Sequence, residues 1–264
     1  MNEVINESQY RLKPTLLNAL IIVVVYVLIL IAMEILSGVP YTDIAKSSHN
    51  LLFGVLIPVA IGSIFLTIIA LWSGWWKDVW RDQYKIKDHS WMHIFLILVI
   101  IGIVANILSG SISSQNSSFI VIALIATAFV GYSEELLTRG LLVRGARGSG
   151  FTEVKVFLIV MLVFGCIHGL NIINGQAILT TVQQIFFAGL TGGVYYTIYR
   201  KTGLLVMPII LHALFDFSLL TMGVVQNSTM TLVSLVVTWL AFILLIPAAR
   251  NFNVKKTTKE EINT

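Results

Sequence analysis

Charged residues are scarce in this sequence. Asp, Glu, Lys and Arg together make up 11% of the 264 residues, while 57% are hydrophobic. A typical soluble domain carries about 25% charged residues. The hydrophobic residues fall in blocks of about twenty, the length of a transmembrane helix, and not in the alternating segments of about ten residues that a membrane barrel uses. The sequence therefore predicts an all-α, polytopic membrane helix bundle, with the lipid bilayer as its surroundings.

Cysteine is nearly absent as well. The single residue, Cys166, cannot form an intramolecular disulfide. The chain also lacks internal repeats and low-complexity tracts, and its formal net charge of +4 comes from basic residues in short loops that form no basic domain. We therefore expect no nucleic-acid partner and interpret residues 1–264 as a single integral membrane domain.

Eight apolar blocks qualify as membrane spans. The first is longer than the core of a signal peptide and lacks a small-residue cleavage site, so we interpret it as an uncleaved span. The predicted spans are Leu16–Leu36, Leu51–Trp72, Trp91–Leu108, Ser118–Val143, Val154–Leu170, Leu179–Tyr199, Leu204–Met222 and Thr229–Ala248.

Basic residues alternate from one side of these spans to the other. Of the 17 Lys and Arg residues, all but Lys46 lie in alternate segments, beginning with the N-terminal one. Segments rich in Lys and Arg stay on the cytoplasmic side of a membrane. The pattern predicts eight spans with both termini in the cytoplasm.

A few ionisable residues lie deep within the predicted spans. Such groups are costly in a bilayer and are candidates for function. The fourth, fifth and seventh spans contribute Glu134, Glu135, Arg139, His168, His212 and Asp216.

Their spacing along the helices separates these residues into groups. Glu135 and Arg139 are four apart, share a helical face and can form an ion pair that lessens the cost of burying each. Glu134 is rotated from them by about 100° and lacks that partner, which favours it as a base. His212 and Asp216 also share a face, so Asp216 can orient or stabilise its histidine.

Three short motifs carry these residues in order along the chain. Residues 134–139 read EELLTR and match EExxxR, residues 164–168 read FGCIH and match FxxxH, and residues 212–216 read HALFD and match HxxxN/D. On separate hydrophobic helices, they resemble the CPBP family of intramembrane proteases, the CAAX-protease and bacteriocin-processing group also called Abi proteins. The resemblance spans about residues 118–218, which would form the catalytic core.

The resemblance implies a role for each motif. Glu134 would activate a water molecule with help from His168, and His212 with Asp216 would stabilise the oxyanion. Eukaryotic CAAX endopeptidases have an asparagine where this chain has Asp216. A carboxylate donates a hydrogen bond only when protonated, so Asp216 can instead orient His212 and leave that histidine as the donor.

The remaining motif residues have supporting or substrate-binding roles. Glu135 and Arg139 would stabilise the fold, or Arg139 would hold a substrate carboxylate. Phe164 shares a helical face with His168.

The sequence leaves the question of a metal open. Glu134, His168 and His212 are enough ligands for a catalytic divalent metal such as zinc, and the resembled family is often labelled metalloprotease on that basis. The chain has no HExxH helix, and a glutamate base with a histidine donor needs no metal in principle. We favour a site without a cofactor.

The leading hypothesis is a hydrolase: an intramembrane peptidase that cuts a hydrophobic or membrane-associated peptide or protein, such as a pheromone or bacteriocin precursor. The alternative is a non-enzymatic immunity or regulatory protein that binds a peptide or membrane partner. Proton-coupled transport would use similar buried groups, but no inverted repeat or paired broken helices support it. The resemblance to bacteriocin-linked members favours a bacterial plasma membrane. The sequence specifies neither the oligomeric state nor the cleavage position.

Overall fold

The computed structural model describes residues 10–112 and 115–252, in which all regular elements are helical.

Capping residues define both ends of the first long helix. The Thr15 side chain accepts a hydrogen bond from the Asn18 backbone at its start, and Gly38 ends it in the left-handed region at a φ of 64°, which glycine adopts without a steric cost. The α-helices are α1 (Leu16–Ser37), α2 (Ser48–Leu51), α3 (Ile57–Ser73), α4 (Trp76–Val79), α5 (Ile94–Ser109), α6 (Ser117–Glu135), α7 (Val143–Gly148), α8 (Glu153–Ile167), α9 (Ile178–Thr202), α10 (Val206–Thr221) and α11 (Ser228–Ala249).

Short helices of other types connect or extend these elements. Two are π-helical and continue directly from an α-helix, so that α2, η3 and α3 form one rod, as do α6, η6 and α7. The others are 3₁₀-helical. The set comprises η2 (Tyr41–Lys46), η3 (Leu52–Leu56), η4 (Ser90–His93), η6 (Leu136–Leu142) and η7 (His168–Ile172).

Each predicted span corresponds to one continuous helical segment, and the all-helical prediction is confirmed. Six of these segments are long and apolar enough to cross a membrane, and α10 is apolar but shorter. The segment outside this group is α9. It carries glutamines, threonines and glycines, and every residue from 192 to 201 is buried. A helix surrounded by protein need not be apolar, which is why α9 is less hydrophobic than a lipid-facing span.

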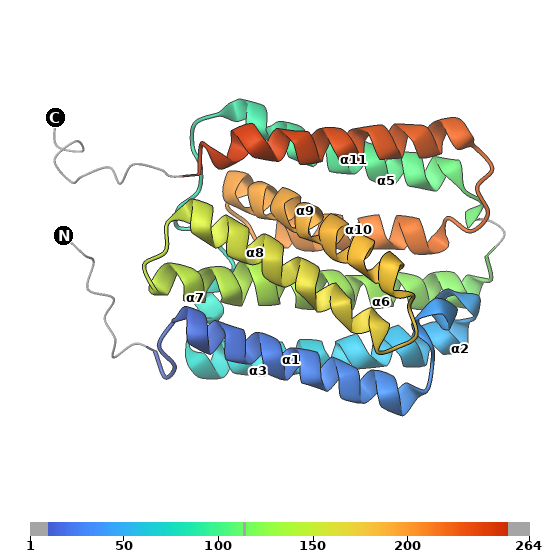
Figure 1. Ribbon diagram of the computed structural model, residues 1–264, viewed down its shortest axis with the longest axis horizontal. Helices are drawn as coiled ribbons and strands as arrows, with labels where there is room; N and C mark the ends of the chain where they lie inside the picture. Colours follow the sequence, from blue (N-terminus) through green and yellow to red (C-terminus); the bar gives the residue numbers. More distant parts are fainter. Residues whose placement is uncertain (1–9, 113–114, 253–264) are drawn as a thin grey trace, which may run out of the picture.

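The helices lie side by side in one bundle with their long axes roughly parallel (Figure 1). The pairs α1 with α3 and α5 with α11 form opposite sides, and α8, α9, α10 and α6 lie between them. The closest neighbours are α8 with α9 and α6 with α10. The three motif-bearing segments therefore lie in the middle of the bundle.

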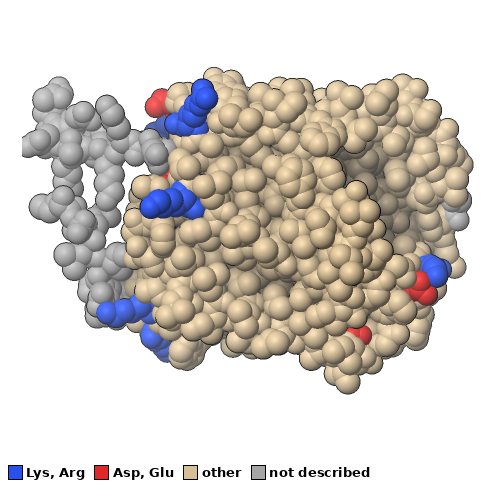
Figure 2. Space-filling model, viewed as in Figure 1, with Lys and Arg blue, Asp and Glu red and all other residues tan. Residues whose placement is uncertain are grey.

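The first and last long helices place the two ends of the described chain together. The start of α1 and the end of α11 lie at the same end of the bundle (Figure 1). Lys and Arg side chains gather at this end on the face drawn in Figure 2. Both observations agree with the predicted even number of crossings, while the count of eight and the cytoplasmic placement stay predictions.

Candidate active site

The first motif lies where α6 changes into a π-helical stretch. Glu134 and Glu135 are the last residues of α6, and η6 begins at Leu136 and includes Arg139. Stretches of π-helix occur frequently at functional sites. The two neighbouring carboxylates differ in exposure, since the Glu134 side chain is 18% exposed and that of Glu135 is fully enclosed.

Glu135 and Arg139 form the ion pair that their spacing predicts. Arg139 NH1 lies 2.9 Å from Glu135 Oε1, and neither side chain has any solvent exposure. Arg139 also donates to Thr138 Oγ1 at 2.7 Å and to the Gly192 carbonyl at 2.7 Å. Because the guanidinium is fully enclosed, the arrangement favours the supporting role over a contact with a substrate carboxylate.

His212 is held between carboxylates on two helices. Its Nδ1 lies 2.8 Å from Glu135 Oε1, and its Nε2 lies 3.3 Å from Asp216 Oδ2. The pairing with Asp216 agrees with their shared helical face. The contact with Glu135 was not predicted, because it joins α6 to α10 and spacing within one helix cannot reveal it. Glu135 Oε1 therefore contacts a basic side chain on each side, Arg139 and His212.

The second motif places His168 at the junction of α8 and η7. Its Nδ1 lies 2.9 Å from the Phe164 carbonyl, a group that only accepts, so Nδ1 carries the hydrogen and Nε2 is left as the acceptor of a neutral ring. The rings of Phe164 and His168 are 5.2 Å apart. Phe164 also packs against Arg139, at 4.4 Å, and against the ring of His212, at 5.8 Å. Phe164 is thus the apolar contact that joins the three motifs.

Glu134 occupies the side of this cluster that faces away from Arg139. Its Oε2 is buried and accepts no hydrogen bond from the described residues. The nearest basic nitrogen is His212 Nε2, at 3.9 Å, and His168 also interacts with Glu134 electrostatically. The Glu134 side chain is 18% exposed, whereas Glu135 is fully enclosed. Glu134 is the carboxylate of this pair that a small molecule can reach.

The geometry does not fit the three-ligand metal site that the sequence left open. Among the described residues, no group of three or more His, Cys, Asp or Glu side chains is placed to hold one ion. Glu134, His168 and His212 are therefore not grouped as the three protein ligands of a catalytic zinc in this arrangement.

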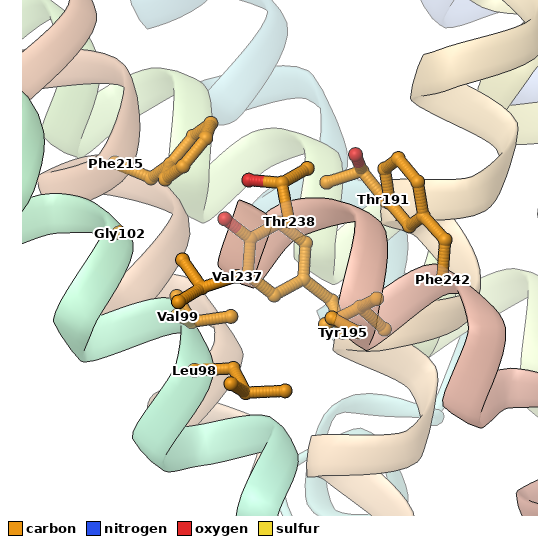
Figure 3. Close-up of a pocket in the computed structure, with 11 residues that line it drawn as sticks. Leu98, Val99, Gly102, Thr191, Tyr195, Phe215, Val237, Thr238 and Phe242 are labelled. Carbon is orange, nitrogen blue, oxygen red and sulfur yellow. The ribbon is translucent and has the colours of Figure 1, made fainter. Parts of the chain in front are cut away.

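A cavity lined mainly by apolar residues lies beside this cluster. It is enclosed by α5, α9, α10 and α11, and Tyr195 extends into it from α9 (Figure 3). The Tyr195 ring stacks on His212 with centroids 5.0 Å apart. Residues at its wall include Leu98, Gly102, Phe215, Val237 and Phe242. The histidine is consequently packed between aromatic rings as well as between carboxylates.

A hydrogen-bonded network lies near the same cluster and was not predicted. Gln184 on α9 accepts from Asn171 Nδ2 at 2.8 Å and donates to the Tyr41 hydroxyl at 3.0 Å. The Tyr41 backbone N–H donates to the Asn174 carbonyl, and the Asn174 side chain binds Glu34. The two glutamines at positions 183 and 184 lie inside an apolar block, and this polar pair is the feature of the sequence from which the network could have been found.

The motif-bearing segment matches a known family. Residues 116–218 match the family model described as type II CAAX prenyl endopeptidase, Rce1-like. A search of curated proteins and a search of solved structures returned no match. The matched range begins and ends within two residues of the range of the sequence resemblance, and it contains all three motifs. The segment that forms the site is thus similar to the type II CAAX prenyl endopeptidases, as the motifs predict.

Proposed function

We propose that this protein is an intramembrane endopeptidase in which Glu134 activates the attacking water. The observation that carries this proposal is the combination found at Glu134: its Oε2 accepts no hydrogen bond from the described residues, as is also true of Glu135 Oε2, but its side chain is 18% exposed while that of Glu135 is fully enclosed. An acceptor left in this state is costly unless a ligand uses it. A water molecule bound there would satisfy it and would be held near the acceptor nitrogen of His168.

The proposed reaction is a general-base hydrolysis. Glu134 takes one proton from the water while the water oxygen bonds to the carbonyl carbon of the peptide, and the carbonyl oxygen becomes an oxyanion. As the tetrahedral intermediate collapses, the carbon–nitrogen bond breaks and the proton passes from Glu134 to the departing amine. His168, through Nε2, orients the water by accepting its second hydrogen. One water molecule is consumed, and one carboxylate and one amine are formed.

The other cluster residues would set the charge and position of this pair. His212 with both nitrogens directed at carboxylates has the hydrogen-bonding pattern of an imidazolium. A cation there, 3.9 Å from Glu134, would stabilise the ionised base and the negative charge of the transition state. Glu135 and Asp216 would hold that cation, and Arg139 would hold Glu135.

The substrate would be a hydrophobic or membrane-associated peptide or protein. The description of the matched family makes a prenylated CAAX peptide the first substrate to test. The resemblance to bacteriocin-linked members makes short hydrophobic precursor peptides the second. We place the protein in a plasma membrane, where both kinds of peptide can reach a site in the middle of the bundle.

The test is Glu134→Gln in purified protein. The amide preserves shape but lacks the basic carboxylate, so we expect cleavage to fall by at least about 100-fold, with unchanged helix content by circular dichroism. Asp78→Asn is a matched control, because Asp78 pairs with Arg144 at 3.1 Å away from the site, and it should keep full activity. Full activity of Glu134→Gln on a substrate that the wild type cleaves would remove Glu134 as the base.

A further inference from the structure

His212, which the sequence left as the oxyanion donor, supplies positive charge to the candidate site but directs both of its nitrogens to carboxylates. An oxyanion formed from the substrate carbonyl must be stabilised by donors aimed at it. Asp216 donates nothing as a carboxylate. His212 directs Nδ1 to Glu135 at 2.8 Å and Nε2 to Asp216 at 3.3 Å, so both of its hydrogens face carboxylates. The guanidinium of Arg139 is fully enclosed.

Tyr41 precedes the family-matched segment by many residues and joins the candidate site through a hydrogen bond to Gln184. It is the first residue of η2, in the connection between α1 and α2. Asp216, Glu134 and Glu34 all act electrostatically on its hydroxyl. Burial, the largest influence, raises the pKa of Tyr41, and these carboxylates raise it too, against a smaller lowering by the Gln184 hydrogen bond. The hydroxyl thus keeps its proton at neutral pH and is a donor.

Gln184 and Asn171 hold the Tyr41 hydroxyl in place. The Gln184 amide donates to the hydroxyl oxygen at 3.0 Å, and Asn171 fixes the other end of the same amide at 2.8 Å. The Tyr41 oxygen accepts this hydrogen bond from Gln184. The hydrogen of the hydroxyl has no acceptor among the described residues and can be donated to a substrate. Tyr41 is therefore a positioned phenol with one hydrogen to donate.

The same network reaches the face of η7 that carries His168. His168 and Asn171 are three residues apart in a 3₁₀-helix, where side chains at that spacing lie one above the other. The chain from Asn171 through Gln184 to Tyr41 thus starts beside one proposed catalytic residue and ends at a hydroxyl that interacts electrostatically with the carboxylates of two others.

We propose that the Tyr41 hydroxyl donates the hydrogen bond that stabilises the oxyanion of the substrate, and that Gln184 positions it. The inference rests on the proposed peptidase function. It assigns to a residue outside the motifs the donor role that Asp216 cannot fill as a carboxylate. Tyr41 forms no covalent bond and its proton stays on the phenol, so the balance of the hydrolysis is unchanged.

The experiment uses Tyr41→Phe in the full-length protein with a peptide that the wild type cleaves in a Glu134-dependent manner. Loss of one oxyanion donor costs about 100-fold in kcat or more, with little change in KM. A phosphinic peptide of the same sequence, a tetrahedral mimic, should lose affinity in parallel, which a purely structural role of Tyr41 would not cause. Tyr132→Phe is the matched control, since that hydroxyl bonds Thr67 between α3 and α6, and it should keep full activity.

A second pair of variants tests the positioning residue. Gln184→Leu frees the Tyr41 hydroxyl and should lower kcat by about 10-fold, whereas its neighbour Gln183→Leu, exposed on α9, should change nothing. Wild-type kcat and unchanged phosphinic-peptide affinity in Tyr41→Phe would overturn the donor role while the peptidase proposal stands. Absence of Glu134-dependent cleavage in the wild type itself would defeat the proposed function and this inference with it.

Discussion

Two groups of buried charges in this bundle differ in how completely they are paired. One is the candidate site in the middle of the bundle. The other, here called the four-residue ion cluster, consists of Asp82, Arg147, Glu153 and Arg200 and joins the loop after α4 to the ends of α7 and α9 and the start of α8. Both bury carboxylates beside cations, at comparable cost in a membrane protein.

The four-residue ion cluster is closed on itself. Asp82 pairs with Arg147 and with Arg200, each at 2.8 Å, and Glu153 pairs with Arg147 at 2.8 Å and with Arg200 at 2.5 Å. Tyr196 adds a hydrogen bond to Glu153 at 2.7 Å. Two negative charges thus meet two positive charges, and each carboxylate contacts both arginines.

The candidate site is left open at one carboxylate. Three acids face Arg139, His212 and His168, and the basic nitrogen nearest to Glu134 Oε2, His212 Nε2, is 3.9 Å away. Asp216 keeps 33% of its side chain exposed, while both partners of the Asp82–Arg200 pair have none. In the four-residue ion cluster every carboxylate is paired with arginines, as expected of a structural cluster. In the candidate site one carboxylate is left without a close partner, which leaves room for a substrate and a water molecule.

The largest effect is expected where the four-residue ion cluster loses a member. Arg200→Met leaves Asp82 and Glu153 buried with one arginine fewer, and breaking a buried pair in this way costs about 3 to 5 kcal/mol of stability. Thermal unfolding in detergent measures this loss. The folded fraction should cleave substrate with a normal kcat, and a normal melting temperature would show that the cluster contributes little.

Removal of the proposed water-orienting histidine should lower the cleavage rate with little loss of stability, the reverse of the result expected for Arg200→Met. His168→Ala deletes a ring whose hydrogen bond within the described structure is to the Phe164 carbonyl, so stability should change little. The cleavage rate should fall by about 100- to 1000-fold. Steady-state kinetics beside a melting curve measures both, and a destabilised variant with full activity per folded molecule would contradict the role.

Glu135→Gln should lower both stability and activity, in contrast to the two variants above. Glu135 binds Arg139 at 2.9 Å and His212 at 2.8 Å, and its amide would keep the shape while leaving one buried cation less compensated. We expect a loss of about 1 to 3 kcal/mol in stability together with reduced activity. Activity unchanged per folded molecule would show that His212 does not depend on Glu135.

The smallest effect is expected from a chelator. Glu134, His168 and His212 are not grouped as metal ligands, so dialysis against a strong chelator should change activity by less than about twofold. Addition of zinc to the dialysed protein serves as the paired measurement. Loss of cleavage on chelation and its return with zinc would replace the metal-free mechanism with a metal-dependent one.

The helical class, the approximate bounds of the helical segments and the motif residues could all be predicted from the order of the amino acids. A backbone segment inside a membrane must satisfy its own hydrogen bonds, and a long apolar block does so by forming a helix. This requirement applies to each segment separately. The ion pair of Glu135 with Arg139 and the pairing of His212 with Asp216 were predictable for the same reason, because each joins residues four apart on one helix. The resemblance of the motif-bearing segment to CAAX proteases was also predictable, because it depends on the order of the three motifs along the chain.

The contacts between helices could not be predicted from the sequence and were found in the folded bundle. The hydrogen bond between Glu135 and His212 joins α6 to α10, and that between Gln184 and Tyr41 joins α9 to η2, over 77 and 143 residues of chain. No periodicity within a helix encodes such contacts, since they depend on how the helices rotate and pack against one another. The state of Glu134, buried and yet without a hydrogen bond, is likewise a property of the packed bundle.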